Sequence, residues 1–464
     1  MFNTDDIVSA TGGKVLSRVA EDFSGVGTDT RVDLSGQIFI ALAGDNYDAH
    51  NFLDKAIQAG AAALVVHSED QITEEIKNKV TVVLVEDTLK ALQDLARFWK
   101  DKLEIPAIAI TGSNGKTTTK EFLAQILSSK YSVAYNKGSF NNHWGVPLNL
   151  LTAKEADEVL IVEMGMNHKG EIESLCAIAH PDITVVNNVG MAHMGEFGSL
   201  EAVAAAKEEI YLSSPKSIGV FNLDNEQTFK MYQKHKEILP KAITFSKDPA
   251  KNTDVSLQVK DSTFESMNVT GSIGGVPGGA QVEVFGLHNI YNLMSAASLA
   301  LAFGMSPADI WAALSRCKTT WGRNQVIKTS GKPNIVFDGY NANPDSMNEL
   351  INNLNQIEQS GAKLLILGEM LELGDQTAEF HFNLGQKVAQ SKATDVWFIG
   401  PSNKQFKDGF DSSENNKNLV ISGTYNEKLA IDFDSMLKPE DIVFIKGSRG
   451  SKLEKVLEAW NIRN

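Results

Sequence analysis

Short apolar runs alternate with amphipathic segments along most of the chain, a pattern typical of α/β proteins. In the first hundred residues three runs predict strands: GQIFIAL, AALVVH and TVVLVE. Two other segments there carry apolar residues at helical spacing: FLDKAIQAG and TLKALQDLARFWKDKL. Pro106 interrupts this pattern, so we predict a first, small α/β domain over residues 1–104.

The α/β pattern continues over residues 105–317, which we predict to form a second domain. Its clearest segments are two strands that run into turns and one helix: EVLIVEMG, DITVVNNVG and GSLEAVAAAKEEIYL. Ser199 is placed to cap that helix. Residues 254–285 alternate around GGVPGG instead, which predicts an antiparallel hairpin added to the sheet.

The remaining segment, residues 318–464, is predicted to be a third domain. It contains four short apolar runs that each end at Gly or Asp: NIVFDG, KLLILG, DVWFIG and DIVFIKG. Helical patterns lie between most of these runs. This alternation predicts a doubly wound, Rossmann-like unit.

Composition and charge narrow the function classes. The 464 residues are 42% hydrophobic and 22% charged, the profile of a soluble globular protein. A formal charge of −15 argues against nucleic acid or an anionic membrane as the main partner, though not against a small anionic substrate. The two cysteines, Cys176 and Cys317, form neither a disulfide framework nor a metal-ligand spacing. No signal peptide or membrane span is visible, so we expect a cytoplasmic enzyme.

The segment AIAITGSNGKTTTKEFL, residues 107–123, joins a predicted strand to a predicted helix through a glycine-containing turn. Gly112 and Gly115 would let backbone N–H groups face inward at the positive end of the helix, which binds phosphate. Lys116 would reach the terminal phosphates and Thr117 would offer a hydroxyl to Mg²⁺. This spacing is two residues shorter than the usual P-loop pattern, so an ordinary glycine-rich turn remains an alternative. We therefore predict a P-loop ATPase-type middle domain with a mostly parallel sheet.

Three polar residues of this domain are candidates for chemistry. Open parallel sheets bind ligands at the carboxyl ends of their strands, so Glu163, which ends VLIVE, is a candidate Mg²⁺ ligand. His193 follows another strand, where a single histidine is more often structural than a metal ligand. Lys207 would ordinarily be an exposed helix lysine, yet it adjoins the apolar stripe of its helix.

A predicted helix start and a later loop add nucleotide-binding candidates. HNIYN places His288, Asn289 and Asn292 on adjacent turns. Asparagine amides can hydrogen-bond an adenine edge, although asparagine at a helix start is more often a cap. Arg323 in GRNQ offers a rigid planar fork suited to phosphate.

The third domain has its own strand-end residues. Asp338, Glu369 and Lys446 all stand at or near the ends of predicted strands. Three such residues in one small domain indicate a second binding face.

These motifs together resemble the Mur ligases, ATP-dependent amide ligases of peptidoglycan synthesis, over essentially the whole chain. TGSNGKTTTK is similar to that family's short phosphate loop, and DTRVDLSGQIFIALAGDNYDAHNF resembles its uridine-nucleotide domain, with Ala49 where glycine is usual. Six further segments match the family pattern: NKGSFNNHWGVPLNLL, EMGMNHKGEI, NVGMAHMGEFGS, FDGYNANPDSM, LGEMLELG and KGSRG.

The resemblance implies roles for individual residues. Glu163 would bridge two Mg²⁺ ions with His193 on the second, and Lys207 would be the lysine that is often carbamylated by CO₂. The implied catalytic residues are Lys116, Lys207, Arg323 and His193, and the implied metal ligands are Thr117, Glu163 and His193. ATP would contact Gly112, Asn114, Gly115, Lys116, Thr117, Thr118, His288, Asn289, Asn292, Arg323, Asp338 and Asn341. The other substrates would contact Thr30, Arg31, Asn141, Asn142, Asn341, Lys446, Ser448 and Arg449.

The implied reaction adds D-alanyl-D-alanine to UDP-N-acetylmuramoyl-tripeptide through an acyl phosphate, in a protein that we expect to be monomeric. Another amide ligase of the same fold is the nearest alternative. A ligase for diaminopimelate or lysine would be expected to show a DNPR-like motif where this chain reads DGYNANPDSM. A folate polyglutamylating enzyme would lack the uridine-nucleotide pattern. A P-loop regulatory NTPase with partner-binding outer domains is the alternative from a different class.

Overall fold

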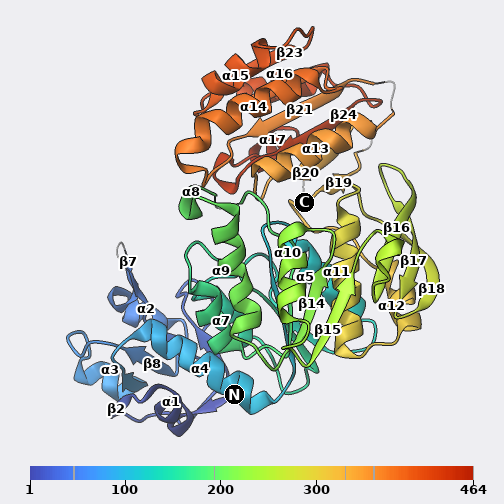
Figure 1. The fold of residues 1–464 in the computed structure, drawn as a ribbon. Helices are drawn as coiled ribbons and strands as arrows, with labels where there is room; N and C mark the ends of the chain where they lie inside the picture. Colours follow the sequence, from blue (N-terminus) through green and yellow to red (C-terminus); the bar gives the residue numbers. More distant parts are fainter. Residues whose placement is uncertain (45–46, 193, 330, 359–360, 463–464) are drawn as a thin grey trace.

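Three large sheets follow one another along the chain, each carrying helices on its faces (Figure 1), and two further sheets have only two strands each. The structure is a computed structural model that describes residues 1–44, 47–192, 194–329, 331–358 and 361–462. The predicted α/β class with mostly parallel sheets is confirmed. None of the helices in those residues is long and apolar enough to cross a membrane.

The first sheet has the strand order β2-β9-β8-β5-β4, in which β2 is antiparallel to β9 and the other neighbours are parallel. The strands are β2 (Lys14–Ser17), β4 (Val26–Gly27), β5 (Ile38–Ile40), β8 (Ala63–Val66) and β9 (Thr81–Leu84). The helices are α1 (Thr4–Thr11), α2 (Leu53–Gln58), α3 (Glu74–Lys79) and α4 (Thr88–Leu103). The three strands predicted here are confirmed as β5, β8 and β9, whereas β2 was not predicted.

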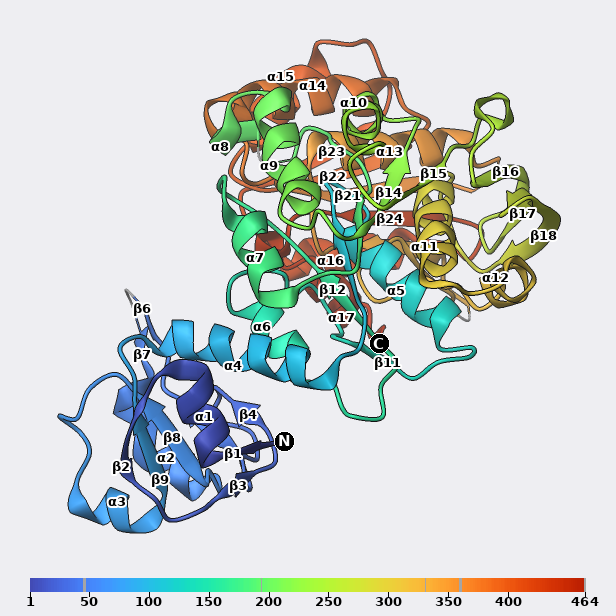
Figure 2. The same cartoon turned by 60° about the horizontal axis from the view of Figure 1, so that its bottom comes forward.

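Helix α4 joins the first sheet to the middle of the molecule (Figure 2). It begins after Asp87, whose carboxylate accepts from two backbone N–H groups of the first turn. Its apolar stripe includes Leu92 and Leu95, which pack in one core with residues of the next sheet and its helices. Trp99 Nε1 also donates to the carbonyl oxygen of Ala153 at 2.9 Å. Helix α4 therefore packs against both the first sheet and the middle of the molecule.

The second sheet has nine strands in the order β11-β12-β10-β13-β14-β15-β16-β17-β18, parallel as far as β16 and antiparallel beyond it. The first six strands along the chain are β10 (Ala107–Thr111), β11 (Val133–Tyr135), β12 (Val159–Glu163), β13 (Ile183–Val186), β14 (Ile218–Asn222) and β15 (Lys241–Phe245). The helices are α5 (Lys116–Leu127), α6 (Gly145–Leu150), α7 (Glu171–Ala179), α8 (Met194–Phe197), α9 (Leu200–Leu212), α10 (Glu226–His235), α11 (Asn289–Phe303) and α12 (Pro307–Leu314).

The predicted hairpin is confirmed, and it belongs to a three-stranded antiparallel extension. The strands are β16 (Val255–Ser262), β17 (Met267–Ile273) and β18 (Val276–Val282). Gly274 and Gly275 connect the last two with φ of +54° and +79°, as a two-residue hairpin turn of type I′ requires. The helix predicted to follow Ser199 is also confirmed, because the Ser199 hydroxyl accepts from Ala202 N at 3.2 Å at the start of α9.

The third sheet has the order β19-β20-β24-β21-β22-β23, with β19 antiparallel to β20 and the rest parallel. Its strands are β19 (Gln325–Ile327), β20 (Asn334–Asp338), β21 (Lys363–Gly368), β22 (Asp395–Ile399), β23 (Asn418–Ser422) and β24 (Ile442–Lys446). The helices are α13 (Pro344–Gln356), α14 (Thr377–Gln390), α15 (Asn403–Asp411), α16 (Glu427–Met436) and α17 (Glu454–Ala459). The four predicted runs are β20, β21, β22 and β24. The sheet edges β19 and β23 were missed.

Candidate active site

The phosphate loop lies between β10 and α5, where the sequence predicts it. Gly112 and Gly115 have φ of +149° and +79°, a region that favours glycine. A Cβ on Gly115 would lie 2.1 Å from Asn292 Oδ1, so the approach of α11 also requires glycine there. The first N–H groups of α5 follow directly, which gives the loop the geometry of an anion-binding site.

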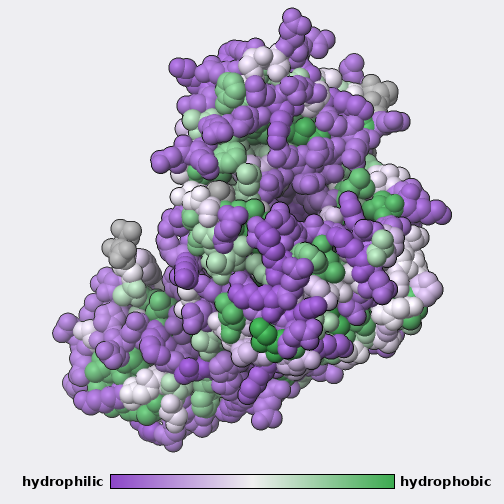
Figure 3. Space-filling view, viewed as in Figure 1, coloured by the Kyte–Doolittle hydropathy of each residue, from purple (hydrophilic) through white to green (hydrophobic). Residues whose placement is uncertain are grey.

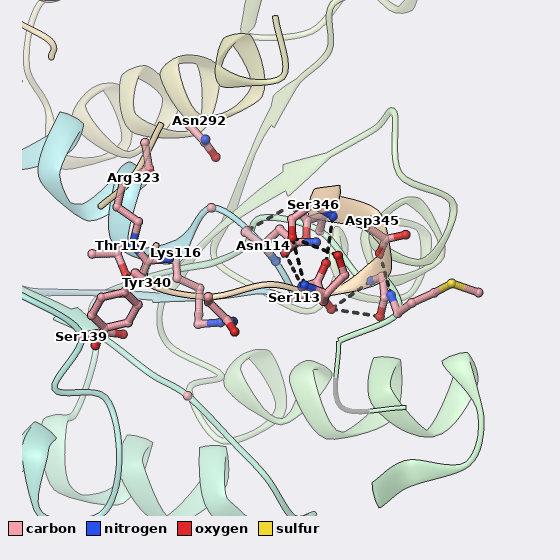
Figure 4. Close-up of a pocket in the computed structure, with 18 of the residues that line it drawn as sticks. Ser113, Asn114, Lys116, Thr117, Ser139, Asn292, Arg323, Tyr340, Asp345 and Ser346 are labelled. Carbon is pink, nitrogen blue, oxygen red and sulfur yellow. Dashed lines mark hydrogen bonds between the residues drawn. The ribbon is translucent and has the colours of Figure 1, made fainter. Parts of the chain in front are cut away.

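Thr117, Glu163 and Arg323 form a short hydrogen-bonded chain beside the loop. The Thr117 hydroxyl donates to Glu163 Oε2 at 2.9 Å and accepts from Arg323 Nη2 at 3.1 Å. The Arg323 guanidinium carbon lies 4.1 Å from the centre of the Tyr340 ring, which supports it from the side. A hydroxyl, a carboxylate and a guanidinium therefore meet at one point, and Thr117, Arg323 and Tyr340 are seen close together in Figure 4.

Glu163 is fully buried at the end of β12, and its second oxygen is held by the loop that follows β11. Ser139 Oγ and Asn141 Nδ2 each donate to Glu163 Oε1 at 2.8 Å. These donors are neutral, so they orient the carboxylate without neutralising its charge.

Two lysines, Lys116 and Lys207, lie near the phosphate loop. Lys116 Nζ donates to the Gly112 carbonyl at 2.8 Å, and burial lowers its pKa while the Glu163 charge acts in the opposite direction. Lys207, on α9, is 1% exposed. Burial, reinforced by the Lys116 charge, holds the pKa of Lys207 well below its usual value. The alternative that Lys207 is an exposed helix lysine is therefore wrong.

The start of α11 brings asparagine amides to the same region. Asn289 is the first residue of the helix, and its Nδ2 donates to the Phe285 carbonyl at 2.8 Å. Asn292 Nδ2 donates to Asn289 Oδ1 at 2.8 Å. Neither side chain is the cap of α11, so the capping alternative does not account for them.

His288 precedes α11 and makes contacts toward the third sheet. Its two ring nitrogens lie 3.1 Å from Asn324 Nδ2 and 3.3 Å from Asn353 Nδ2. Burial lowers the pKa of His288 to about 4, which makes the ring neutral at pH 7.

Asp338 and Lys446 stand opposite each other at the ends of the neighbouring strands β20 and β24. Lys446 Nζ donates to Asp338 Oδ2 at 2.5 Å and to the Asn341 carbonyl at 2.9 Å. Both side chains are buried. Glu369 is not part of this group, because its carboxylate accepts from the Ser402 hydroxyl at 2.5 Å.

One cavity of about 980 Å³ connects the ends of the second and third sheets. The surface is hollowed between these two parts, with mainly hydrophilic residues around the hollow (Figure 3). Most of the predicted site residues line it: Asn114, Gly115, Lys116, Thr117, Thr118, Asn141, Asn142, Glu163, His288, Asn289, Asn292, Arg323, Asp338, Asn341, Lys446, Ser448 and Arg449.

Other predicted residues lie elsewhere. Gly112 and Lys207 do not line the cavity. Thr30 and Arg31 belong to the first sheet's surroundings, where Arg31 is 87% exposed and pairs with Asp29 at 2.7 Å. His193 lies outside the described residues.

Direct contacts of the third domain with the phosphate loop and with the segment after β13 were missed by sequence reasoning (Figure 4). Asn343 Nδ2 donates to Asn114 Oδ1 at 2.7 Å, and Met191 N donates to Asp345 Oδ2 at 2.7 Å. Tyr340 and Asn343 lie in the segment FDGYNANPDSM, which sequence reasoning did single out. The signal for them was present as a motif, but their partners could not be assigned.

The structure combines a small α/β domain, a middle domain with a short P-loop and a Rossmann-like third domain. The middle and third domains share one cavity. This combination defines the class of protein. The chain belongs to the Mur ligase family. Models of that family match residues 22–100 ("Mur ligase family, catalytic domain"), 110–300 ("Mur ligase middle domain") and 322–449 ("Mur ligase, glutamate ligase domain"). The resemblance noted in the sequence is confirmed.

Within that family, the chain is similar over nearly its full length to relatives that share one name. The chain is 35% identical over 435 residues to UDP-N-acetylmuramoyl-tripeptide–D-alanyl-D-alanine ligase of Bacillus subtilis (strain 168), covering 94% of this chain and 92% of the relative. It is 30% identical to the ligase of the same name from Escherichia coli (strain K12), covering 94% and 93%.

Solved structures agree over nearly the whole length. MurF from Acinetobacter baumannii superposes with a TM-score of 0.87 at 28% identity, covering 100% of this chain and 99% of that one. MurF ligase from Thermotoga maritima, solved in complex with ADP, gives a TM-score of 0.80 at 27% identity and covers 94% of this chain and 96% of that one.

The oxygen atoms beside the phosphate loop fit a Mg²⁺ ion that is bound together with a nucleotide. Among the residues that the structure describes, no three His, Cys, Asp or Glu side chains gather as a metal site. A Mg²⁺ ion bound with a nucleotide needs only one or two protein oxygens, because phosphate and water supply the rest. Thr117 Oγ1 and Glu163 Oε2, 2.9 Å apart beside the phosphate loop, meet that requirement.

Proposed function

We propose that this protein uses ATP to join D-alanyl-D-alanine to UDP-N-acetylmuramoyl-tripeptide in peptidoglycan precursor synthesis. The observation that carries the proposal is the single cavity in which the phosphate loop, the Thr117–Glu163–Arg323 chain and the Asp338–Lys446 pair lie together. Curated relatives of that name match over nearly the full length, which supports the choice of substrates.

The first step is transfer of the γ-phosphoryl group from ATP to the terminal carboxylate of the tripeptide, with ADP leaving. The loop N–H groups and Lys116 hold the phosphates, and Arg323 binds the transferred group. The buried amides of Asn289 and Asn292 are proposed to hydrogen-bond adenine, with His288 beside them and Asp338 on the ribose.

Thr117 and Glu163 would hold Mg²⁺, which neutralises phosphate charge when it is bound. In the two-ion arrangement that the family resemblance implies, Glu163 would help to hold both ions and His193 would help to hold the second. The oriented, uncompensated charge of Glu163 supports this role.

The second step is attack of the dipeptide amine on the acyl phosphate, followed by loss of phosphate from the tetrahedral intermediate. Asn341, Lys446, Ser448 and Arg449 are proposed to contact the dipeptide from the third domain. Asn141 and Asn142 are proposed to contact the tripeptide, and Thr30 and Arg31 the uridine diphosphate. The contacts of the third domain with the phosphate loop and with Met191 favour exclusion of water, which would hydrolyse the acyl phosphate.

Lys207 is proposed to react with CO₂. A neutral amine attacks the carbon of CO₂ and loses a proton, which yields an anionic N-carboxylate. The lowered pKa of Lys207 supplies the neutral amine. The predicted domain limits at residues 104 and 317, the cytoplasmic location and the monomeric state also remain part of this proposal.

An omission experiment tests the proposed function. Protein, ATP and Mg²⁺ are mixed with UDP-muramoyl-tripeptide, D-alanyl-D-alanine, both or neither, and phosphate release is followed together with product mass. We expect full phosphate release only with both substrates, accompanied by a UDP-muramoyl-pentapeptide product. Equal release in all four mixtures would overturn the assignment and favour a regulatory NTPase. Product formation with another amino acid in place of the dipeptide would favour a different Mur-type ligase.

A further inference from the structure

Lys120 is a second lysine of α5, one helical turn after Lys116, and it is fully buried. Its ammonium does not point into the cavity. It donates to the carbonyl oxygens of Asn136 at 2.6 Å and Gly138 at 2.5 Å, and Glu121 Oε1 lies 3.3 Å away. An ammonium has three N–H donors, so these three oxygens satisfy it.

The two carbonyls belong to the loop that follows β11 and carries Ser139 and Asn141. This loop leaves the sheet at Tyr135 and turns at Gly138, whose φ is +87°. Its far end is fixed by Gly165 N, which donates to the Asn141 carbonyl at 2.8 Å. At its near end, Lys120 supplies hydrogen bonds that a strand ladder would otherwise provide.

The segment between these two anchors contains both donors to Glu163 Oε1. Ser139 Oγ and Asn141 Nδ2 therefore sit where Lys120 and Gly165 hold the backbone. Glu163 Oε2 is then left to face the Thr117 hydroxyl. A continuous series of contacts runs from the Lys120 ammonium to the carboxylate.

A neutral side chain of similar length could fill the same space, but it would leave two inward-facing carbonyls unpaired. That loss favours a rearranged loop, since unpaired buried polar groups are costly. A structural role alone would affect folding stability. The contacts to Ser139 and Asn141 imply in addition that the orientation of Glu163 would change.

We propose that Lys120 is a positioning residue of the metal site, which holds the loop over residues 136–141 so that Glu163 is aimed at Thr117. This inference rests on the proposed function in one respect only, namely that Glu163 and Thr117 bind the divalent ion of the nucleotide.

The test measures metal binding rather than ligation. Binding of Mn²⁺ to the full-length protein with ADP is followed by electron paramagnetic resonance, alongside Mg²⁺-dependent ADP binding by calorimetry. Lys120→Met is compared with Asn141→Ala and with the double variant. Residues that orient a metal ligand typically change metal affinity by 10- to 100-fold, so we expect Mn²⁺ to bind about tenfold more weakly to each single variant. The double variant should be no worse than the weaker-binding single variant, because both act through Glu163.

Lys130 provides a matched control, since it follows the same helix and makes an exposed ion pair with Asp309. Lys130→Met should leave Mn²⁺ affinity unchanged. If Lys120→Met does not fold, Lys120→Gln retains two N–H donors without the charge, and a weaker affinity is expected there too.

Wild-type Mn²⁺ affinity in a folded Lys120 variant would overturn the proposal, whatever its melting temperature. Additive losses in the double variant would also contradict it. Failure of the proposed function is distinguishable: the wild-type protein would bind Mn²⁺ with ADP but form no pentapeptide product, and the Lys120 variants would still be judged by their metal affinity.

Discussion

Two lysines, Lys116 at the start of α5 in the middle domain and Lys446 at the end of β24 in the third, line the same cavity in different electrostatic settings. Lys446 is paired with a buried carboxylate, Asp338, at 2.5 Å. Lys116 donates to a backbone carbonyl instead, and burial lowers its pKa. The middle domain therefore keeps a cation that is poorly compensated until an anion binds, whereas the third domain presents a pair that is already neutral.

This difference predicts that Lys116 contributes mainly to ligand binding, whereas the Lys446–Asp338 pair contributes mainly to stability. A ligand phosphate would provide the negative charge that Lys116 lacks, so binding energy is available there. The Lys446–Asp338 pair contributes a fixed framework, and its disruption would leave a charge without a partner.

Lys116→Met should abolish ligation while leaving the unliganded protein folded. Loss of a preorganised donor to the transferred phosphate costs on the order of 10³-fold in kcat. The melting temperature without nucleotide should be unchanged or raised, because burial disfavours the charged ammonium that the substitution removes. Steady-state phosphate release and calorimetry measure the two effects. A large drop in melting temperature would mean that Lys116 is a structural residue.

Lys446→Met should give the opposite pattern of stability. Asp338 would be left buried and uncompensated, which typically costs about 3–5 kcal/mol in the free energy of unfolding. The double variant Lys446→Met/Asp338→Asn should recover much of this loss, since no charge is stranded. Urea unfolding of the two variants measures the coupling. Equal destabilisation in both would show that the pair does not act as a unit.

Sequence reasoning located the strand-end residues of both domains because apolar runs mark parallel strands, and parallel strands bring their ends to one edge. It did not predict that Lys207 is buried. Residues on both sides of the α9 stripe are covered by neighbouring elements, and one-face periodicity does not reveal that. Strand β23 was missed because its apolar run is only three residues long, Leu419 to Ile421, and its side chains are only partly buried.

Lys207 should make the stability of the unliganded protein increase with pH. Its pKa in the folded protein lies well below the unfolded value of 10.5, so the unfolded chain binds more protons between these two values. Within that window, stability rises with pH by up to about 1.4 kcal/mol per pH unit. The unfolding free energy of wild type minus that of Lys207→Met should therefore become more positive as the pH rises toward 10.5.

Urea unfolding in CO₂-free buffer measures this difference. Lys79 is an exposed control whose pKa is raised by Glu75, so Lys79→Met should show no such trend below its usual titration range. A pH-independent difference for Lys207→Met would contradict the lowered pKa and remove the support for carbamylation.

The contact between Asn343 and Asn114 was the least accessible to sequence reasoning, because the two residues are 229 positions apart and lie in different domains. A single sequence contains no signal for how two separately folded units dock. Periodicity predicts the elements of each unit, and motifs indicate which loops carry polar residues. The pairing of two particular amides depends on the docked arrangement itself.

This contact should matter for nucleotide affinity more than for folding. Asn343 has two roles: its Oδ1 accepts from Ser346 N at 2.9 Å as the cap of α13, and its Nδ2 donates to Asn114. Asn343→Ser retains a good capping oxygen but is too short to reach the phosphate loop. We expect an unchanged melting temperature and a KM for ATP raised about fivefold, since a net hydrogen bond is worth about 1 kcal/mol.

A matched variant separates capping from docking. Asn426 caps α16 by accepting from Leu429 N at 3.2 Å and does not line the cavity. Asn426→Ser should leave the KM for ATP and for both other substrates at wild-type values. If Asn343→Ser behaves in the same way, the docking contact does not support the phosphate loop, and the arrangement of the two domains must depend on other contacts such as that between Met191 and Asp345.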